Sequence, residues 1–400
     1  MILFNADRAE ALVAEAHLDG LVAATQENFL YTTGILNVNA FVLPRIVQAY
    51  AVLCRDGLTT PAVVMGAGDA DQYLTAFPGV GPLYLFGTFY REAPHPEVLD
   101  DREQRLQILT ADGQRHQGPG DALVAALRGT GLTAGTIGLD EEGVHPSVIE
   151  HVAGHLPGIR LVNASALFRT IRMVKTAAEI ARLQRAQAAC EAGIQAVATM
   201  ARAGVTERAM AAAYAAGVGG AGGRVTFALI RIGRNAALGQ LPPDDTPLRY
   251  GDHVWLDVGA QVEGYHADLA RILALGEPNT KLRRYYAAAL RGEEHAFAVT
   301  RPGMTADRVF QETVDVVRRS GIPHYRRHHV GHGIGAEVYD PPVLNLATST
   351  PIEAGMVINV ETPYYELGWG AIHVEDPYVV AAHGHNRWLT TMSRDLLIVE

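Results

Sequence analysis

The stretch HVWLDVGAQVEGYHADLARIL, residues 253–273, decides the fold class of the second half of this chain. Two runs of apolar and β-branched residues flank Glu263-Gly264, and such a dipeptide is typical of a two-residue hairpin turn. That turn pairs Asp257 with Ala270 across the two strands. Asp268 lies two residues from Ala270, and side chains two apart point to the same face of a sheet. The sequence therefore predicts that Asp257 and Asp268 converge on one face of an antiparallel hairpin.

A second hairpin is predicted over INVETPYYELGWGAIHVEDPYVV, residues 358–380. Glu361 and Glu375 lie at equal distances on either side of Gly368, so a turn there places their side chains opposite each other on one face. Carboxylates clustered on a half-buried sheet repel one another and are costly to desolvate. Divalent cations offset both effects, and Asp and Glu oxygens suit Mn²⁺, Zn²⁺, Co²⁺ or Mg²⁺.

A histidine between glycines adds a fifth candidate ligand. His332 lies in HHVGHGIGAEVYDPP, residues 328–342, where the flanking glycines allow close approach of the backbone. An imidazole added to four carboxylates moves the metal preference from Mg²⁺ and Ca²⁺ towards transition metals. The predicted ligands of a two-metal hydrolase are Asp257, Asp268, His332, Glu361 and Glu375.

The remaining sequence predicts two domains, at 1–168 and 169–400, because 400 residues exceed what one core usually holds. In the first domain, expected helices alternate with expected strands, which favours an α/β layer. These elements are helices at 7–18 and 122–132 and strands at 21–25, 50–54 and 136–140. The strongest helix signal, residues 175–203, begins the second domain with Thr176 and Glu179 in capping-box spacing.

Strand and helix signals are segregated in the second domain, which predicts an α+β fold with an antiparallel sheet. Helices are expected at 206–216, 280–299 and 305–320. Residues 217–223, GVGGAGG, match a dinucleotide-binding spacing, but they follow a helix and precede a strand, the reverse of what that site needs. We interpret this segment as a flexible connection.

Composition excludes several classes of partner. The formal net charge of −10 argues against nucleic acid or an anionic membrane, because both reward clustered Lys and Arg. Cys54 and Cys190 form no metal-binding spacing and are expected to be reduced thiols. Charges at Asp7, Arg8 and Glu10 interrupt any signal-peptide core, and no apolar run reaches membrane-span length. We therefore expect a soluble cytoplasmic protein.

Together the motifs resemble those of the Xaa-Pro peptidase and creatinase family. The resemblance implies a pita-bread C-terminal catalytic domain preceded by a creatinase-type α/β N-terminal domain. The segment MVKTAAEIARLQRA also resembles the helix between these domains. The matching motifs are DVG at 257–259, ADLAR at 267–271, GHGIG at 331–335, NVETP around Glu361 and HVEDP around Glu375.

The resemblance implies a prolidase, a dinuclear-metal hydrolase that cleaves the Xaa-Pro bond of dipeptides and acts as a homodimer. Asp257 would bind one metal through both oxygens, and Asp268 and Glu375 would bridge both metals. His332 and Glu361 would bind the second metal. A hydroxide bridging the metals would be the nucleophile, and Glu361 would accept the proton from the water that forms it. Mn²⁺ is the usual ion in this family, and Co²⁺ or Zn²⁺ also serve.

Three positions depart from the family pattern. Gln240 and Tyr339 stand where the family generally has His, and His373 stands where many members have Arg. His328, four residues before His332, is retained, and its counterpart lies beside the substrate. Gln240 and Tyr339 can hydrogen-bond a substrate carbonyl, but only Tyr339 can donate a proton.

These four residues are the predicted partners of the substrate. We expect His328, Tyr339 and Gln240 to serve catalysis alongside the metal site. His328, Tyr339 and His373 are expected to bind the substrate, with His373 or a nearby arginine holding the terminal carboxylate of a dipeptide.

Several alternatives stay open. An aminopeptidase acting on longer Xaa-Pro peptides is the nearest, and Gln240 and Tyr339 leave room for another amide substrate. A metal-free creatinase-like amidinohydrolase and a non-catalytic binding module share the fold. The complete ligand set argues against these two, because such members have lost ligands.

Overall fold

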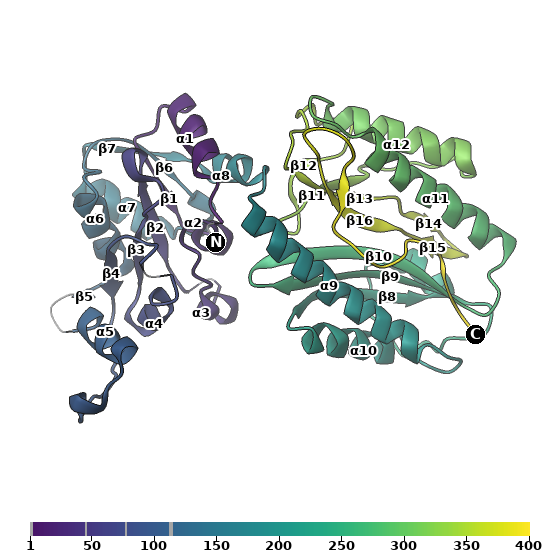
Figure 1. Ribbon diagram of the computed structural model, residues 1–400, viewed down its shortest axis with the longest axis horizontal. Helices are drawn as coiled ribbons and strands as arrows, with labels where there is room; N and C mark the ends of the chain where they lie inside the picture. The colour runs from purple at the N-terminus through teal and green to yellow at the C-terminus, as the bar shows by residue number, and fades with distance from the viewer. Residues whose placement is uncertain (1–2, 45, 77, 112–114) are drawn as a thin grey trace. The chain divides into compact units, whose positions relative to one another are not determined.

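The computed structural model describes residues 3–44, 46–76, 78–111 and 115–400. The chain divides into two compact units, Met1–Arg172 and Met173–Glu400 (Figure 1). The sequence placed the boundary between residues 168 and 169, and the structural division falls at the end of helix α8 (Ser165–Arg172). Across the described ranges, no helix is both long enough and apolar enough to cross a bilayer.

The first unit is built on a mixed sheet. Its described residues form seven strands in the order β5-β4-β3-β2-β1-β6-β7. Strand β2 runs antiparallel to β1 and β3, and the other neighbours are parallel. The strands are β1 (Gly20–Ala23), β2 (Tyr50–Cys54), β3 (Ala62–Gly66), β4 (Leu83–Phe86), β5 (Arg115–His116), β6 (Gly135–Leu139) and β7 (Ile159–Asn163).

Helices connect these strands, which confirms the expected alternation of helix and strand. Helix α1 begins where the side chain of Asn5 accepts a hydrogen bond from the Arg8 amide, and its buried face carries Ala9 and Val13. Leu123 and Leu127 of α6 pack into the same core as Val22 of β1. The helices are α1 (Ala6–Glu15), α2 (Gln26–Thr33), α3 (Val38–Val42), α4 (Ala70–Tyr73), α5 (Asp101–Leu109), α6 (Pro119–Gly129), α7 (Pro146–His155) and α8.

The second unit contains a larger sheet, with the path β12-β11-β13-β16-β10-β9-β8 and two further strands at its margins. Every pairing is antiparallel except β10 with β18, so the expected antiparallel sheet is confirmed along the main path. Its strands are β8 (Arg224–Ile232), β9 (His253–Val262), β10 (Tyr265–Leu275), β11 (Gly331–Gly333), β12 (Asp340–Val343), β13 (Val357–Glu361), β16 (Glu375–Val379), β17 (Arg387–Trp388) and β18 (Leu397–Val399).

The structure confirms both predicted hairpin registers. Glu263 and Gly264 adopt φ values of 48° and 82°, as a tight turn with two left-handed residues requires. Asp257 pairs with Ala270 across β9 and β10. The second hairpin pairs Glu361 with Glu375, and beyond them its tip continues as the separate two-stranded ribbon of β14 (Tyr364–Glu366) and β15 (Gly370–Ile372).

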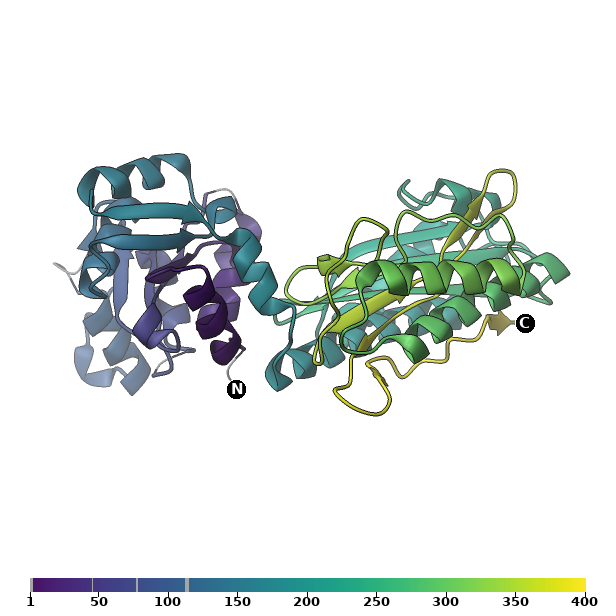
Figure 2. The same ribbon diagram turned by 90° about the horizontal axis from the view of Figure 1, so that it is seen from above.

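Two pairs of helices cover different halves of this sheet, on the same face of its strands (Figure 1). Val254 of β9 packs with α9 (Ala177–Met200) and α10 (Glu207–Gly220), and Tyr378 of β16 packs with α11 (Thr280–Val299) and α12 (Ala306–Ser320). Figure 2 shows α11 and α12 lying over the sheet of the second unit. Asp257 has the opposite parity to Val254, and Glu375 has the opposite parity to Tyr378, so the predicted carboxylates belong to the face that the helices leave uncovered.

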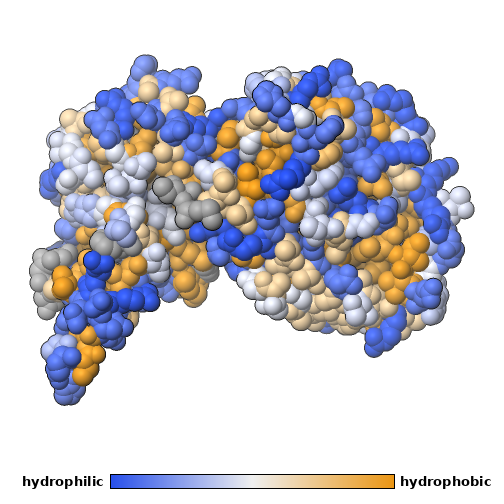
Figure 3. Space-filling model, in the orientation of Figure 1, coloured by the Kyte–Doolittle hydropathy of each residue, from blue (hydrophilic) through white to orange (hydrophobic). Residues whose placement is uncertain are grey.

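The interpretation of the glycine-rich segment as a flexible connection is wrong for its first half, because α10 continues to Gly220. A Cβ at Gly217 would lie 2.7 Å from the Ala192 carbonyl oxygen, and one at Gly193 would lie 2.5 Å from the Tyr214 ring. Glycine therefore allows α9 and α10 to approach closely, and packing offsets its poor helix propensity. Figure 3 shows a weakly hydrophobic surface over α10, in keeping with its alanine-rich sequence.

The predicted capping box at the start of α9 is confirmed. The Glu179 amide donates to Thr176 Oγ1 over 3.3 Å, and the Thr176 amide donates to Glu179 Oε2 over 2.8 Å. The Tyr265 hydroxyl donates to the other carboxylate oxygen of Glu179 over 3.1 Å. Burial raises the pKa of Glu179 to about 7, although the nearby Lys175 ammonium opposes the shift.

Candidate functional site

One row of residues crosses the two predicted hairpins and forms the floor of the candidate site. Ala270 of β10 pairs with Asp257 on one side and with Glu375 of β16 on the other. Glu375 in turn pairs with Glu361 of β13. Asp268 lies two residues before Ala270 on β10, so its side chain points to the same face. The sheet therefore brings all four predicted carboxylates together.

His332 reaches these carboxylates from β11, which lies beside β13. Potential ligand atoms form two groups that share Glu375, and within each group they lie within 4.8 Å of one another. One group contains Asp268, His332 and Glu375, and the other contains Asp257, His373 and Glu375. A shared carboxylate between two groups is the arrangement that a pair of neighbouring metal ions needs.

The orientation of His332 leaves one nitrogen free for a ligand. Its Nδ1 donates to the Gly333 carbonyl oxygen over 2.8 Å, so in the neutral ring Nε2 carries the lone pair. His332 is fully buried, and burial lowers the pKa of its imidazole. Among the described residues, Nε2 has no hydrogen-bond partner, and it lies 3.7 Å from Asp268 and 3.9 Å from Glu375. This is how a metal-binding histidine is held by its other nitrogen.

The carboxylates around His332 lack compensation for their charge. Burial and the neighbouring carboxylates raise the pKa of Asp268 and Glu375 well above the usual range. Burial likewise raises the pKa of Asp257 to about 6. Asp268 Oδ1 is buried without a hydrogen-bond partner in the described chain. Carboxylate oxygens and an unpartnered imidazole nitrogen fit divalent transition metals.

Glu361 has a different environment from the other three carboxylates. His329 Nδ1 lies 2.8 Å from Oε1, Arg327 Nη2 donates to Oε2 over 3.2 Å, and His373 Nε2 lies 3.5 Å from Oε2. Burial opposes ionisation, but these neighbours hold the pKa of Glu361 well below its usual value. The Glu361 carboxylate is therefore ionised and contacts Arg327 and His329, and it lies outside the two groups that share Glu375.

Sequence reasoning missed two residues that position the carboxylates. Asn359 Nδ2 donates to Glu375 Oε1 over 2.6 Å, and His329 contacts Glu361. Asn359 could have been found, because it lies two residues before Glu361 on β13 and so faces the same side. His329 lies outside any regular element, where no periodic signal indicates which way a side chain points.

Two predicted substrate residues lie at the open side of the site. The Tyr339 ring stacks on His332 with centroids 3.6 Å apart, and it is 52% exposed although His332 is fully buried. His328 is exposed and its ring lies 4.2 Å from that of His329. Both side chains can therefore meet a substrate that approaches the carboxylates.

The other two predicted substrate residues lie elsewhere. His373 is 2% exposed and its ring lies among the carboxylates rather than at the open side. Gln240 is exposed in the turn after the 3₁₀ helix η5 (Gly233–Leu238), and no described contact joins it to the carboxylates. The turn itself lies close to the site. A Cβ at Gly239 would lie 2.8 Å from the Trp255 ring, and that ring stacks on His373.

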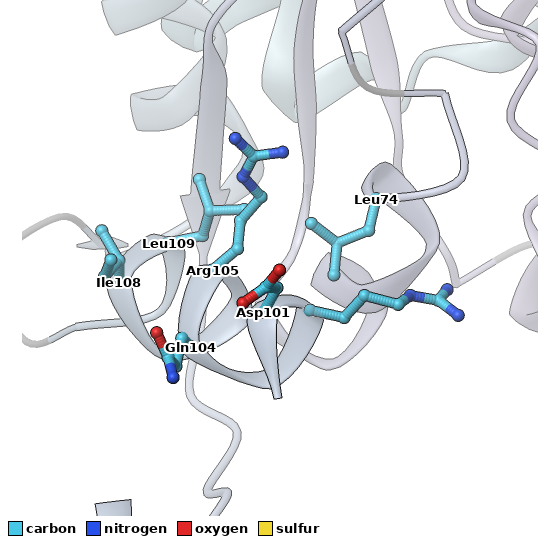
Figure 4. Close-up of a pocket in the computed structure, with 7 residues that line it drawn as sticks. Leu74, Asp101, Gln104, Arg105, Ile108 and Leu109 are labelled. Carbon is cyan, nitrogen blue, oxygen red and sulfur yellow. The ribbon is translucent and has the colours of Figure 1, made fainter. Parts of the chain in front are cut away.

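A surface hollow in the first unit lacks these features. It lies beside α5 (Figure 4), and its charged side chains are exposed, so solvent screens them; none of its described lining residues has a buried polar atom without a partner. We therefore place the functional site in the second unit. The labelled lining residues are Leu74, Asp101, Gln104, Arg105, Ile108 and Leu109.

Comparison with known proteins gives a match to each unit. Residues 181–382 match the model of metallopeptidase family M24, and residues 6–174 match the creatinase/prolidase N-terminal domain. The chain is 32% identical to a probable dipeptidase PepE of Mycobacterium bovis, over 66% of this chain and 69% of that one. It is 29% identical to an Xaa-Pro dipeptidase of Pyrococcus furiosus, over 58% of this chain and 67% of that one.

Solved structures share the whole fold. An Xaa-Pro dipeptidase from Bacillus anthracis superposes with a TM-score of 0.79 at 21% identity, covering 98% of this chain and 99% of that one. A dipeptidase from Pyrococcus horikoshii OT3 gives a TM-score of 0.77 at 23% identity, with the same coverage. At these identities the likeness concerns the fold.

Proposed function

The chain belongs to metallopeptidase family M24, and from this premise we propose that it is a metal-dependent Xaa-Pro dipeptidase. The predicted fold, a creatinase-type N-terminal domain followed by a pita-bread catalytic domain, is confirmed together with the predicted family. The proposal concerns the reaction, the metals and the residues that serve them. Relatives named as Xaa-Pro dipeptidases support the choice of substrate.

One observation carries the proposal. The two groups of ligand atoms share Glu375, and the first contains a buried imidazole nitrogen and a buried carboxylate oxygen without partners in the described chain. Burying such atoms unpaired costs on the order of 1–3 kcal/mol each, and more where charge is involved. A protein retains that arrangement when a ligand supplies the missing interactions.

The proposed ligands are the five predicted from the sequence. Asp257, Asp268, His332, Glu361 and Glu375 would hold the two metals, and the sharing of Glu375 between two groups of ligand atoms supports this. Two divalent ions held there would lower the pKa of a water and polarise the scissile carbonyl. Mn²⁺ is the ion we propose, with Co²⁺ or Zn²⁺ as substitutes, in a cytoplasmic homodimer.

Side chains around the proposed ligands would hold these ligands in their orientations. The Gly333 carbonyl fixes the tautomer of His332, and Asn359 holds one oxygen of Glu375. His329, His373 and Arg327 together keep Glu361 ionised against the effect of burial, and the ionised carboxylate is the form that can accept a proton from water. These contacts make the site rigid before substrate binds.

Substrate contacts would come from the open side. Tyr339 is the proposed hydrogen-bond partner and proton donor of the substrate, because its exposed ring lies on His332 at the open side of the site and carries a hydroxyl. His328, exposed near His329, is the proposed partner of the peptide backbone. Gln240 would contact substrate from the turn beside Trp255.

Hydrolysis by metal-stripped protein, with and without added Mn²⁺, tests the proposal. Substrates are Ala-Pro, Met-Pro and a longer Xaa-Pro peptide, with Ala-Ala as the control for dependence on proline. We expect cleavage of the two Xaa-Pro dipeptides only when Mn²⁺ is present. Equal cleavage of the longer peptide would change the conclusion to an Xaa-Pro aminopeptidase. Absence of turnover in a protein that binds two metals would refute peptidase action on these substrates.

A further inference from the structure

We propose that His373 is a sixth metal ligand, so that each of the two metal positions contains an imidazole. The inference rests on the proposed dinuclear site and extends it to a residue outside the five predicted ligands. The family pattern that the sequence resembles places Arg at this position in many members, and a guanidinium cannot serve as a ligand because it is always protonated. The substitution therefore changes which chemistry this position can perform.

The surroundings of His373 support a ligand role. Its ring atoms lie close to three carboxylates, with Nε2 3.3 Å from Glu375 and 3.5 Å from Glu361, and Nδ1 3.8 Å from Asp257. Neither nitrogen makes a hydrogen bond of acceptable geometry within the described chain, although the side chain is only 2% exposed. One nitrogen can bind a metal and the other can then hydrogen-bond a carboxylate, as in many metal sites.

The grouping of ligand atoms points to the metal position that His373 serves. His373 forms a group with Asp257 and Glu375, whereas His332 belongs to the group on the other side of Glu375. The Trp255 ring stacks against His373 with an interplanar angle of 15° and centroids 6.1 Å apart. Trp255 is fully buried, so this contact fixes the plane of the imidazole.

A role in binding a substrate carboxylate fits His373 less well. The terminal carboxylate of a dipeptide would have to approach a ring whose two nitrogens already face Asp257, Glu361 and Glu375. Like charges at such distances repel strongly when they are buried. A cation at the same place is attracted by all three. The position predicted from sequence for substrate binding is therefore better suited to a metal.

A second imidazole has a consequence for metal selectivity. Nitrogen ligands favour Co²⁺, Ni²⁺ and Zn²⁺ over Mn²⁺, which prefers oxygen. The metal position next to Asp257 would otherwise be formed by carboxylates alone. With His373 in place, we expect this position to prefer Co²⁺ over Mn²⁺ more strongly than a site formed by the five predicted ligands alone would.

Metal titration of the full-length protein tests the inference without reference to turnover. Metal-free wild type, His373→Ala and His373→Arg are titrated with Co²⁺ and with Mn²⁺ by calorimetry, and the visible absorption of Co²⁺ is recorded at each equivalent. His383→Ala, which changes an exposed histidine in a turn, is the matched control. His373→Arg supplies the residue of the family pattern, so it keeps the test valid if His373→Ala fails to fold.

We expect two Co²⁺ equivalents in the wild type and the control. In both His373 variants the affinity for one of the two Co²⁺ ions should fall at least about tenfold. Even a residue that only hydrogen-bonds to a metal ligand contributes 10–100-fold to affinity. The Co²⁺ absorption bands should change, and binding of Mn²⁺ should weaken less. Unchanged Co²⁺ affinities and spectra in the variants would overturn the inference and leave the dinuclear site intact. Wild type that binds no metal would instead overturn the proposed function itself.

Discussion

Asp140 in the first unit directly follows strand β6 and Asp268 in the second lies within β10; both are buried carboxylates, yet their surroundings differ completely. Asp140 accepts hydrogen bonds from the Ala24 and Thr25 amides and from the side chains of Thr25, Asn28 and Ser165, over 2.7–3.0 Å. Asp268 is 4% exposed, and its Oδ1 has no donor among the described residues. A buried carboxylate surrounded by donors supports the fold, whereas one without donors needs a ligand.

The same contrast occurs between two consecutive residues of β16. Asp376 points away from the site and accepts two hydrogen bonds from the Arg271 guanidinium, over 2.8 and 2.9 Å. Glu375 points into the site, where Asn359 is its hydrogen-bond donor and other carboxylates surround it. The two faces of this strand therefore differ in charge compensation, and only the face that carries Glu375 needs a cation.

The largest expected effect comes from Asp268→Asn. The variant keeps the shape of the side chain but removes one charge from the site. We expect kcat/KM for Ala-Pro to fall at least about 10³-fold, beyond the 10–100-fold that an outer partner of a ligand contributes. The metal-free variant should melt at a higher temperature than metal-free wild type, because a repelled carboxylate is gone. Retained activity with full metal content would contradict the role of Asp268 as a ligand.

Asp140→Asn should produce the opposite combination. Its amide nitrogen would face donors, and charge-assisted hydrogen bonds would be lost, so we expect the free energy of unfolding to fall by about 2–4 kcal/mol. Metal content should stay at the wild-type value, because Asp140 belongs to the first unit. Urea denaturation and metal analysis of the purified variant measure the two effects. A variant as stable as wild type would show that the donors around Asp140 contribute little.

Glu179 provides an intermediate case that depends on pH. Its pKa is raised from 4.5 to about 7, so its contribution to stability is fully present below pH 4.5 and is lost as the pH rises through 7. Glu179→Gln keeps a capping residue that does not titrate. Relative to this variant, metal-free wild type should lose on the order of 3 kcal/mol between pH 4.5 and pH 8, at 1.36 kcal/mol per unit of pKa.

The control for this experiment is another capping-box glutamate. Glu103 occupies the same position of α5 but is exposed, so Glu103→Gln should show no comparable dependence on pH. Urea denaturation across the pH range measures all three proteins under identical metal-free conditions. Parallel curves for wild type and Glu179→Gln would mean that Glu179 is ionised in the folded protein at neutral pH.

The hairpins could be predicted because local rules determine them. A two-residue turn fixes the pairing of Asp257 with Ala270, and equal spacing around Gly368 fixes that of Glu361 with Glu375. No local rule states that β10 pairs with β16, which is the contact that brings the two hairpins together. The resemblance to a family supplied that step at the level of the sequence.

Local sequence rules could not predict the contacts of side chains that lie outside helices and strands. His329 and Arg327 precede β11 in an irregular segment, so neither parity nor helical period indicates that both contact Glu361. The glycines at the end of α10 were interpreted from their motif spacing and their place between a helix and a strand, although the close approach of α9 explains them. In both cases the deciding contact comes from residues distant in sequence.

The smallest expected effect comes from Tyr339→Phe. This variant tests whether a residue that supports a metal ligand also takes part in the reaction. The ring that stacks on His332 remains and only the hydroxyl is lost, so metal content and melting temperature should match the wild type. If the hydroxyl contacts substrate, kcat/KM should fall roughly tenfold, since one hydrogen bond contributes about 1.4 kcal/mol. Tyr339→Ala removes the ring as well and should also weaken metal binding, because His332 loses the contact that holds its plane. Wild-type kinetics in Tyr339→Phe would place the hydroxyl outside the reaction and leave Tyr339 as a support for His332 alone.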